Sequence, residues 1–560
     1  MRPQPVVRRL WLYQSSISSP TTTSRRTTIL AQRSLSLVQA SRISTRCRPT
    51  ISFLYSPATS PSPIRTYASQ RSKTWLHHQA KLLVRYALIS WAGMICISVI
   101  YFFYDQEKLE RVYPTPHEWG WRERKMLRHA HRCTDPENRE SSWAKVHGIA
   151  RNLCLALEDP KRQGNKIPRL HDHEDPNDEV PWEFIPHDLS GVSEEWRRAY
   201  FETIMLTAKA AGCVDGHLTD GKSKYAWPPE FVIGPSNPRP RPIPPGSPPA
   251  PREEDCELAC PPADRYYLKI LATKGLSARQ KMEAALEYAS FIETKRQPQS
   301  PEPLYNLALA EATQGMDQTK LPFHSKTLVL KDNGPAPSQN IFDAITAIAN
   351  HKARNGNAAA ALPIYVSLLK ARRSLSDTPP RIAQPPKPRL AWHQQLIKLL
   401  AQPDYPPPPP DGTQPPWRSP EERCQEASLN LYIGEILYTS SSRENGVAWT
   451  REGVDIAEQE LRELNQSGGP APAKDRCREC LKTGLDNWAV MVARLAKEEQ
   501  LRRESKPSVF SFWSSGSSRG DAEGRWAAEG AVVEERTKRT NDMVEDLKPL
   551  PEGIMRYLKA

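Results

Sequence analysis

The residues of this chain that could bind a metal or form a disulfide are few and scattered. Its ten cysteines include two close pairs, Cys256 with Cys260 and Cys477 with Cys480. A structural zinc site needs two such pairs, or a Cys pair and a His pair, that converge in space, and no His pair lies near either one. Cys256 and Cys260 lie in a Pro-rich stretch and could form a local disulfide in an oxidising compartment. Cys477 and Cys480 are three residues apart in an apparent helix, where simple burial on one face explains them.

One dense polar cluster, residues 171–175 with the sequence HDHED, contains side chains that bind metals. It lies between Pro168 and Pro176 and lacks helical spacing, so a solvated loop is the better interpretation. The sequence motifs of zinc proteases, phosphate-binding loops, dinucleotide-binding turns and serine-hydrolase nucleophile turns do not occur. We therefore expect no catalytic residues, no metal and no cofactor. A membrane-bound enzyme without any of these motifs is the alternative.

The net charge of +13 is concentrated near the N-terminus. Residues 1–104 contain 14 Lys and Arg and no Asp or Glu, so subtracting those 14 charges from +13 leaves −1 for residues 105–560. A nucleic-acid-binding body would keep a positive face, and no RNA- or DNA-reading motif occurs in this part of the chain. We therefore expect no nucleic-acid partner.

Residues 86–104 contain no charged side chain, and the rest of the chain is organised around them. At ~1.5 Å of rise per residue, a helix of this length just crosses the ~30 Å hydrocarbon core of a bilayer. Lys81 and Arg85 precede the stretch, and Tyr86 and Tyr104 at its ends suit the membrane interfaces. A buried core helix is the alternative. No second stretch is as apolar, so the sequence predicts a single span through the lipid bilayer.

The segment before the span has the composition of a mitochondrial presequence. Residues 1–67 are rich in Arg and Ser, lack acidic residues and begin with an amphipathic stretch, whereas a secretory signal would need an uninterrupted apolar run. Ser-rich disorder without targeting is the alternative. The stretch RTYAS, which contains Arg65, resembles the cleavage site of matrix-processed presequences and places the cut between Tyr67 and Ala68.

These segments predict an orientation and a division of the chain. Because the basic flank before the span should stay in the matrix, the C-terminal part should face the intermembrane space, which makes this a single-pass protein of the mitochondrial inner membrane. The expected parts are a presequence at 1–67, a matrix flank at 68–85, the span at 86–104, a helical domain at 105–500 and a partly disordered tail at 501–560 with one more helix around 532–547.

The part of the chain after the span is predicted to be all-α. From residue 142 onwards, short helices alternate with Pro-rich loops, and hardly any alternating β pattern occurs. Ser193 caps one predicted helix, which Gly212 should end. Ser277 and Gln280 form the capping box of another.

The clearest helical pair spans residues 340–373 and resembles a tetratricopeptide repeat. Such a unit of about 34 residues places small residues, a Gly turn and an aromatic at fixed positions. Those positions hold Ala349, Gly356, Ala361 and Tyr365. Two departures are Arg373 in place of the terminal Pro and Pro363 inside the second helix.

Further helical pairs extend the pattern along the chain. A second match spans residues 425–461, with a lengthened turn at 440–446, and weaker pairs surround 266–292 and 304–313. A last helix runs over 475–501. We count five to six repeat-like units, more than the three or so that a solenoid needs. A generic α-helical domain is the alternative.

A solenoid of this kind binds peptides or helices on its concave face. The repeat frame directs Thr346, Asn350, Ala353 and Arg354 inward from the first match, and Ser428, Glu435 and Tyr438 from the second. Pro-rich runs at 235–262, 379–388 and 403–420 separate the units. They form stiff surface loops or ligands for Pro-binding modules, and we favour loops.

The order of presequence, single span and divergent repeat body resembles the fungal tetratricopeptide adaptor subunit of the mitochondrial i-AAA protease complex. Locally the resemblance rests on residues 340–373 and on the helix CRECLKTGLDNWAVMVARL. It implies a non-catalytic adaptor that captures unfolded client proteins of the inner membrane or intermembrane space and presents them to membrane-embedded AAA protease subunits. The alternative is a scaffold or assembly factor for a respiratory-chain or import complex, which would hold one folded partner.

Overall fold

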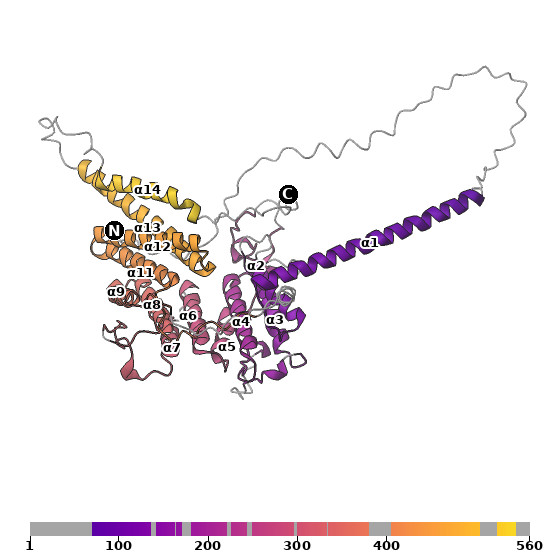
Figure 1. Ribbon diagram of the computed structural model, residues 1–560, viewed down its shortest axis with the longest axis horizontal. Helices are drawn as coiled ribbons and strands as arrows, with labels where there is room; N and C mark the ends of the chain where they lie inside the picture. The colour runs from indigo at the N-terminus through magenta and orange to yellow at the C-terminus, as the bar shows by residue number, and fades with distance from the viewer. Residues whose placement is uncertain are drawn as a thin grey trace, which may run out of the picture. The chain divides into compact units, whose positions relative to one another are not determined.

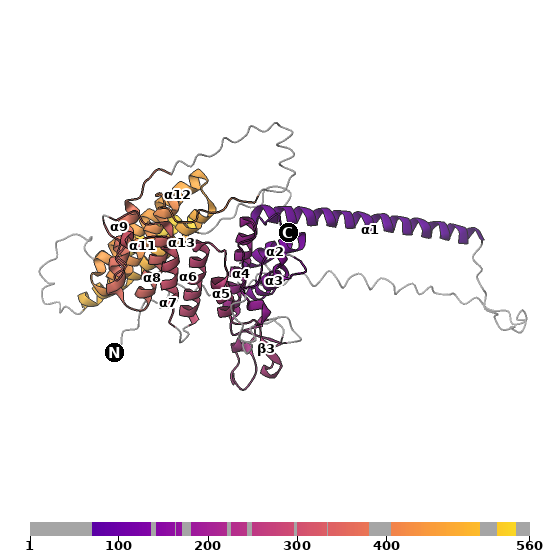
Figure 2. The ribbon, with the colours of Figure 1, turned by 90° about the horizontal axis from the view of Figure 1, so that it is seen from below.

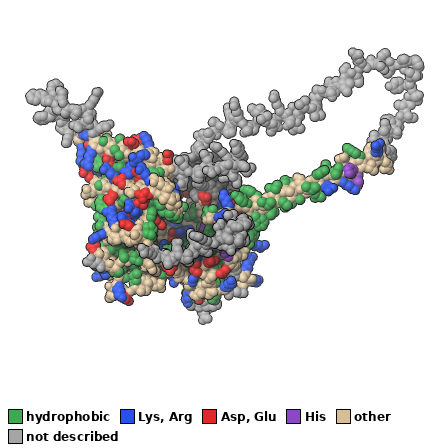
Figure 3. Space-filling model, viewed as in Figure 1, with side chains coloured by type: hydrophobic (Ala, Val, Ile, Leu, Met, Phe, Trp, Pro, Cys, Tyr) green, Lys and Arg blue, Asp and Glu red, His purple; other side chains and the backbone are tan. Residues whose placement is uncertain are grey.

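The apolar stretch of residues 86–104 lies within helix α1, Gln70–Val112, of the computed structural model (Figure 1). Among the described residues, α1 is the one helix long and apolar enough to cross a membrane by length and composition. Its apolar side chains, such as Trp91 and Ile100, are exposed, and Figure 3 shows them along the helix. Pro114 and Pro116 follow its last residue, and proline cannot continue the helical hydrogen bonding.

The structure describes residues 70–135, 142–162, 164–170, 181–220, 226–243, 249–295, 300–332, 334–379, 405–504 and 524–544. The chain divides into two compact units, Met1–Tyr104 and Asp105–Ala560. The expected presequence with its cleavage site at Arg65, Tyr67 and Ala68 lies outside the described residues, and so does the HDHED cluster.

The second unit is mostly helical, which confirms the predicted helical class. Its helices are α2 Trp121–Thr134, α3 Trp143–Glu158, α4 Glu194–Val214, α5 Ala263–Ala272, α6 Ala278–Lys295, α7 Glu302–Ala312, α8 Gln339–Arg354, α9 Ala358–Arg373, α11 Pro420–Ser440, α12 Arg443–Ser467, α13 Ala471–Glu504 and α14 Arg525–Val544. Short 3-10 helices are η3 Gly164–Lys166, η4 Trp182–Phe184, η5 Pro229–Phe231, η6 Glu253–Asp255 and η7 Gln318–Lys320. Figures 1 and 2 show the α-helices of this unit following one another in chain order.

Each helix of the second half packs on its neighbours in the chain. Helix α8 packs on α9, α9 on α11, and α11 on both α12 and α13. In addition, α6 contacts α8 directly, so alternate helices also touch. Ile345, Tyr365 and Ile433 belong to one buried apolar cluster that joins α8, α9 and α11. Helices that follow one another in the chain therefore pack together, and some alternate helices touch as well.

Helix α14 extends the helical body beyond the boundary expected at residue 500. It packs on α13, and its Val533 is buried in the same apolar cluster as Trp488 and Leu461. Trp526 and Met543 flank that contact. The further helix expected around residues 532–547 is therefore present as α14, and it packs on α13.

A small sheet interrupts the helices, although the sequence indicated hardly any strand. Its order is β2-β1-β3, with β1 Leu218–Asp220, β2 Ala226–Trp227 and β3 Cys256–Leu258 all antiparallel to their neighbours. Strands of two or three residues are too short to show an alternating pattern, so the sequence could not reveal them.

Helix caps follow the sequence more closely than helix ends do. The Ser193 hydroxyl accepts from the Trp196 N–H. Gln280 and Ser277 form both bonds of the predicted capping box, at 3.0 and 3.2 Å. Gly212 does not end α4, which runs on to Val214. A Cβ at Gly212 would lie 3.0 Å from the Phe291 ring, so this glycine serves close packing instead.

The turn between α11 and α12 is shorter than expected. It consists of Ser441 and Ser442 alone, and Gly446 lies inside α12. A Cβ at Gly446 would lie 2.7 Å from the carbonyl oxygen of Gly434 in α11. The two glycines therefore let the helix backbones approach closely, whereas the sequence suggested a loop.

Candidate functional site

Half-buried polar side chains from α6, α8, α11 and α13 form a connected row, which we call the shared face. It consists of Glu293, Asn350, Arg354, Glu435 and Asn487. On α8, Asp343, Asn350 and Arg354 are seven and four residues apart, so they lie on one side of that helix. Spacings of four and three residues place Ser428, Tyr432 and Glu435 on one side of α11.

Glu293 links α6 to α8. Its carboxylate accepts from Arg354 Nη1 at 2.7 Å and lies 3.1 Å from His351 Nδ1. The hydroxyl of Tyr305, on α7, donates to the same carboxylate at 3.1 Å. The Arg354 side chain keeps 32% of its exposure, so its guanidinium is held in place and still reaches solvent.

Two tyrosines connect α8 with α11. The Tyr365 hydroxyl donates to Asn350 Oδ1 at 2.6 Å, and its ring lies 5.4 Å from that of Tyr432. Burial raises the pKa of Tyr432 to about 12, and the charges of Glu435 and Arg354 act on this hydroxyl in opposite directions. The two tyrosines therefore link Asn350 of α8, through Tyr365 of α9, to α11.

Glu435 connects α11 to α13 within the shared face. Asn487 Nδ2 donates to its Oε1. Burial raises the pKa of the Glu435 carboxyl to about 7, which the bond from Asn487 partly opposes. At neutral pH this group is therefore divided between its acid and carboxylate forms, so it can donate to or accept from a bound backbone.

Three of the predicted binding residues, Asn350, Arg354 and Glu435, are half-buried members of the shared face. Thr346 and Ala353 are half-buried on α8, and the Thr346 hydroxyl donates to the Phe342 carbonyl at 2.6 Å. Ser428 is half-buried, with its hydroxyl 3.1 Å from the Cys424 carbonyl and 2.8 Å from Cys480 Sγ. These contacts occupy both hydroxyl groups within the body.

Tyr438 is not on the shared face, which corrects the prediction. It is buried and its hydroxyl donates to the Met491 carbonyl at 3.1 Å. Sequence reasoning also missed Glu293 and Asn487. They lie on α6 and α13, and the repeat frame that would have oriented them was assigned only to the two clearer pairs.

A disulfide joins Cys424 of α11 to Cys477 of α13. Cys256 and Cys260 are both free thiols, so the local disulfide expected there does not form. Cys256 begins strand β3, while Cys260 is buried and its thiol donates to the Ala211 carbonyl of α4. The two thiols therefore have different surroundings, Cys256 in strand β3 and Cys260 against α4. Cys477, for which simple burial was expected, is covalently paired, and Cys480 is a buried thiol.

A second polar cluster is enclosed by α3, α4 and α5. Lys269 Nζ donates to Glu158 Oε1 and to the Glu183 carbonyl, both at 2.6 Å, and the Tyr200 hydroxyl donates to Glu158 at 2.8 Å. Desolvation raises the pKa of Glu158, although Lys269 opposes that shift. The side chains of Lys269 and Glu158 are 2% and 1% exposed, so they hold helices together and leave no room for a substrate.

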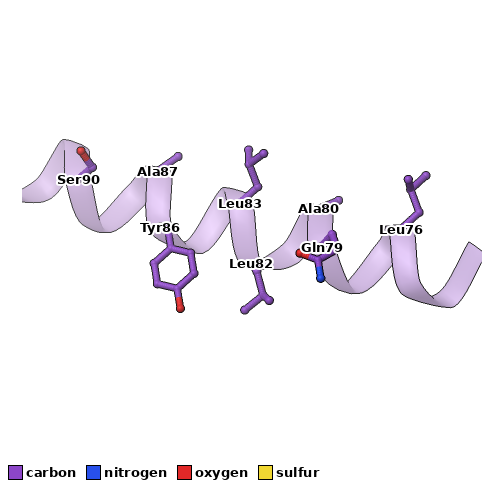
Figure 4. A pocket seen from close by; sticks show the side chains of 8 residues that line it. All are labelled: Leu76, Gln79, Ala80, Leu82, Leu83, Tyr86, Ala87 and Ser90. Carbon is purple, nitrogen blue, oxygen red and sulfur yellow. The ribbon is translucent and has the colours of Figure 1, made fainter.

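Figure 4 shows the side chains that line a pocket on helix α1. Its lining residues all come from α1, and Leu76, Leu83 and Tyr86 are among them. This is an apolar surface on a single helix, as expected of a lipid-facing segment. Across the ranges that the structure describes, no group of three or more His, Cys, Asp or Glu side chains could hold a metal ion.

Comparison of the chain with protein-family models, with curated proteins and with solved structures finds no match. Function is therefore inferred from the shared face, the disulfide and α1.

Proposed function

We propose that this protein is a non-catalytic adaptor, anchored in the mitochondrial inner membrane, that binds unfolded client proteins and presents them to AAA protease subunits. On this proposal, the stacked helical pairs from α4 to α14 form a divergent tetratricopeptide-like solenoid. The observation that carries the proposal is the shared face, where α6, α8, α11 and α13 present half-buried polar groups in one row.

The chemistry of the shared face suits an extended polypeptide. Asn350, Arg354 and Asn487 offer N–H donors to backbone carbonyls, while Glu293 and Glu435 accept from backbone N–H groups. Such groups recognise a main chain whatever its side chains are, which is what a receptor of many unfolded clients needs. The donors are held in place by hydrogen bonds within the body, so little side-chain entropy is lost on binding.

The disulfide supports a place in the intermembrane space. Disulfides persist in oxidising compartments and are rare where glutathione and thioredoxin keep thiols reduced. Cys424 and Cys477 both follow the span, so the body would lie on the oxidising side. The basic flank before α1 favours the same orientation, because positive charge is retained on the matrix side.

The proposal is tested by affinity isolation of the tagged protein from digitonin-solubilised mitochondria, followed by mass spectrometry. We expect AAA protease subunits together with several non-native proteins. A variant carrying Arg354→Gln and Asn487→Ala should keep the protease and lose most of the clients. The matched control is Lys370→Gln, since Lys370 pairs with Asp332 at an exposed site away from the shared face.

A different result would support a scaffold. The adaptor proposal is wrong if no AAA protease subunit is isolated and one respiratory-chain or import subunit dominates, in an amount equal to that of the tagged protein. The doubly substituted variant must keep the thermal unfolding midpoint of the control, so that lost clients report lost binding.

A further inference from the structure

Residues 405–414, with the sequence YPPPPPDGTQ, form an extended segment that lies on three helices of its own chain. We call these residues the strap. The prolines at 406–410 are exposed, and the contacts are made by Tyr405, by backbone carbonyls and by the buried Gly412. Because consecutive prolines adopt the polyproline II conformation, the strap is stiff before it docks.

One end of the strap is held by Arg198 of α4. Its guanidinium donates to the carbonyls of Pro406 and Pro407 at 2.7 and 3.0 Å. The same guanidinium lies 4.4 Å from the centre of the Tyr405 ring, a cation–π contact. The Arg198 side chain is only 15% exposed. Arg198 therefore binds two adjacent carbonyl groups of the strap and the aromatic ring of the residue before them.

The other end of the strap docks on the first turn of α8. The Asn340 N–H donates to the Gly412 carbonyl at 3.0 Å, and Asn340 Nδ2 donates to the Asp411 carbonyl at 2.9 Å. The Gln339 N–H donates to the Gln414 carbonyl at 3.2 Å. First-turn N–H groups have no partner within their own helix, and here the strap supplies one.

Gly412 is required for this approach. Its φ is +66°, a left-handed conformation that favours glycine. A Cβ there would lie 2.1 Å from Asn340 Oδ1 and 2.7 Å from Arg279 Nη1 of α6. The strap thus touches α4, α6 and α8 in turn.

The length of the strap matches the spacing of these helices. Six residues separate Pro406 from Gly412, which at ~3.1 Å per residue span ~19 Å. Packed helices lie about 8–10 Å apart, so two steps from α4 through α6 to α8 cover ~16–20 Å. Because α4 contacts α6 and α6 contacts α8, the strap crosses one continuous row of helices.

The strap lies close to the side of these helices that carries the shared face. On α8, Asp343 is seven residues before Asn350, a rotation of about 20° around the helix axis, and Asn340, which binds the strap, is ten residues before it, a rotation of about 80°. On α6, Arg279 is fourteen residues before Glu293, again on one side. The strap covers the N-terminal ends of a surface whose C-terminal ends carry the shared face.

We propose that the strap is a built-in ligand of the surface that Arg198, Arg279 and Asn340 form, and that an extended segment of an unfolded client binds there by displacing it. This inference rests on the proposed function, since it names the surface to which the client binds and the strap as its competitor. Polyproline II is a major conformation of unfolded chains, so a client segment can present its carbonyls to Arg198 and Asn340 as the strap does.

The test uses the full-length protein in digitonin micelles and a fluorescein-labelled peptide of the strap sequence. Gly412→Ala should release the strap and leave Arg198, Arg279 and Asn340 in place, so the labelled peptide should bind at least about tenfold more tightly than to the wild type. Adding Arg198→Met to that variant should remove the gain. Gly315→Ala is the matched control, because Gly315 has a φ of +82° and no atom within 4 Å of an added Cβ.

Amide hydrogen exchange at Gln339 and Asn340 provides a second measurement. Exchange should be faster in Gly412→Ala than in the wild type and should slow again when the peptide is added. If Gly412→Ala does not fold, Tyr405→Ala releases the other end of the strap and serves in its place. Equal affinity of the peptide for the wild type and the released variant would overturn the inference.

Reduced, carboxymethylated α-lactalbumin, an unfolded protein, separates the two proposals. We expect it to bind more tightly to Gly412→Ala and to compete with the labelled peptide. If it binds the wild type and the variant equally without competing, the strap is not the client's competitor, while the adaptor function stands. If it binds to no variant, the proposed function fails and the inference fails with it.

Discussion

Charged side chains inside the helical body are buried against partners from other helices. Arg372 of α9, 1% exposed, pairs with Glu422 of α11 and lies 4.6 Å from the centre of the Phe342 ring. Burial lowers the pKa of Arg372 to about 10, so its guanidinium keeps its charge at neutral pH. A charge that is both buried and permanent makes its partner indispensable, because an unpaired charge is costly in an apolar interior.

Replacing Arg372 by Met should therefore destabilise the protein by about 3–5 kcal/mol, because Glu422 would stay buried without its partner. Replacing both residues, Arg372→Met with Glu422→Met, should recover most of that loss. Urea unfolding of the full-length protein in micelles, followed by tryptophan fluorescence, measures both. Arg373→Met is the matched control, since its pair with Glu452 is exposed and worth about 0–1 kcal/mol. A double variant as unstable as the single one would contradict this account.

Glu435 gives the shared face a pH dependence. Its pKa of about 7 lies above the unfolded value of about 4.3, so the native state binds more protons than the unfolded state between these values. Stability should therefore fall as pH rises from about 4.5 through 7. Glu435→Gln keeps an acceptor for Asn487 and removes the charge. We expect it to be more stable than the wild type by about 1–2 kcal/mol at pH 8 and to show no such gain at pH 5.

Unfolding of the wild type and Glu435→Gln at both pH values measures this difference. Glu452→Gln, an exposed position on α12, controls for the loss of a negative charge as such. A gain that is equal at pH 5 and pH 8 would show that Glu435 is not the titrating group.

The helical frame predicted residue positions where one periodicity sufficed. Asn350 and Arg354 lie on one side of α8, as the helical period predicts, because four residues separate them. Tyr438 follows Glu435 by three residues, and both contact α13, Glu435 through Asn487 and Tyr438 through the Met491 carbonyl. Tyr438 is buried in that contact, and the sequence does not show where α13 lies.

At the scale of elements, the disulfide ties α11 to α13 across α12. Cys424 and Cys477 are 53 residues apart, a separation at which the chain-entropy model gives about 4 kcal/mol. The variant Cys424→Ser with Cys477→Ser should lose about 2–4 kcal/mol of stability, and reductant should have little further effect on it. Cys256→Ser is the control, since Cys256 is a free thiol away from both helices. Unfolding with and without dithiothreitol measures the difference, and a wild type insensitive to reductant would contradict the prediction.

Elements were predictable where their signals are local, and harder where the cause is tertiary. The caps at Ser193 and Ser277 were predicted correctly because the bonding partners lie three residues away. Gly212 and Gly446 were interpreted as breaks, yet each lies inside a helix where another element comes close. The pairing of Cys424 with Cys477 likewise depends on α11 and α13 being neighbours, which no local pattern shows.

At the scale of the whole molecule, the proposed orientation makes one prediction for the topology of α1 and one for the redox state of the disulfide, and both must hold. If α1 spans the inner membrane with its basic flank in the matrix, a C-terminal tag should be protected in intact mitochondria and digested by added protease in mitoplasts. Cys424 and Cys477 should then be oxidised in the isolated protein, as a thiol-alkylation gel shift would show.

Deleting residues 86–104 should separate these two properties. Without the span, the presequence should carry the whole body into the matrix, where the tag stays protected in mitoplasts and the same two cysteines stay reduced. A variant that keeps the span but carries Cys424→Ser with Cys477→Ser controls for the alkylation pattern. If the tag of the full-length protein is protected in mitoplasts, the orientation is wrong. If the disulfide forms equally without the span, the compartment and the pairing of the two cysteines are not linked. Digestion in mitoplasts together with an oxidised pair would instead place the shared face and its strap on the intermembrane-space side, within reach of the clients proposed for them.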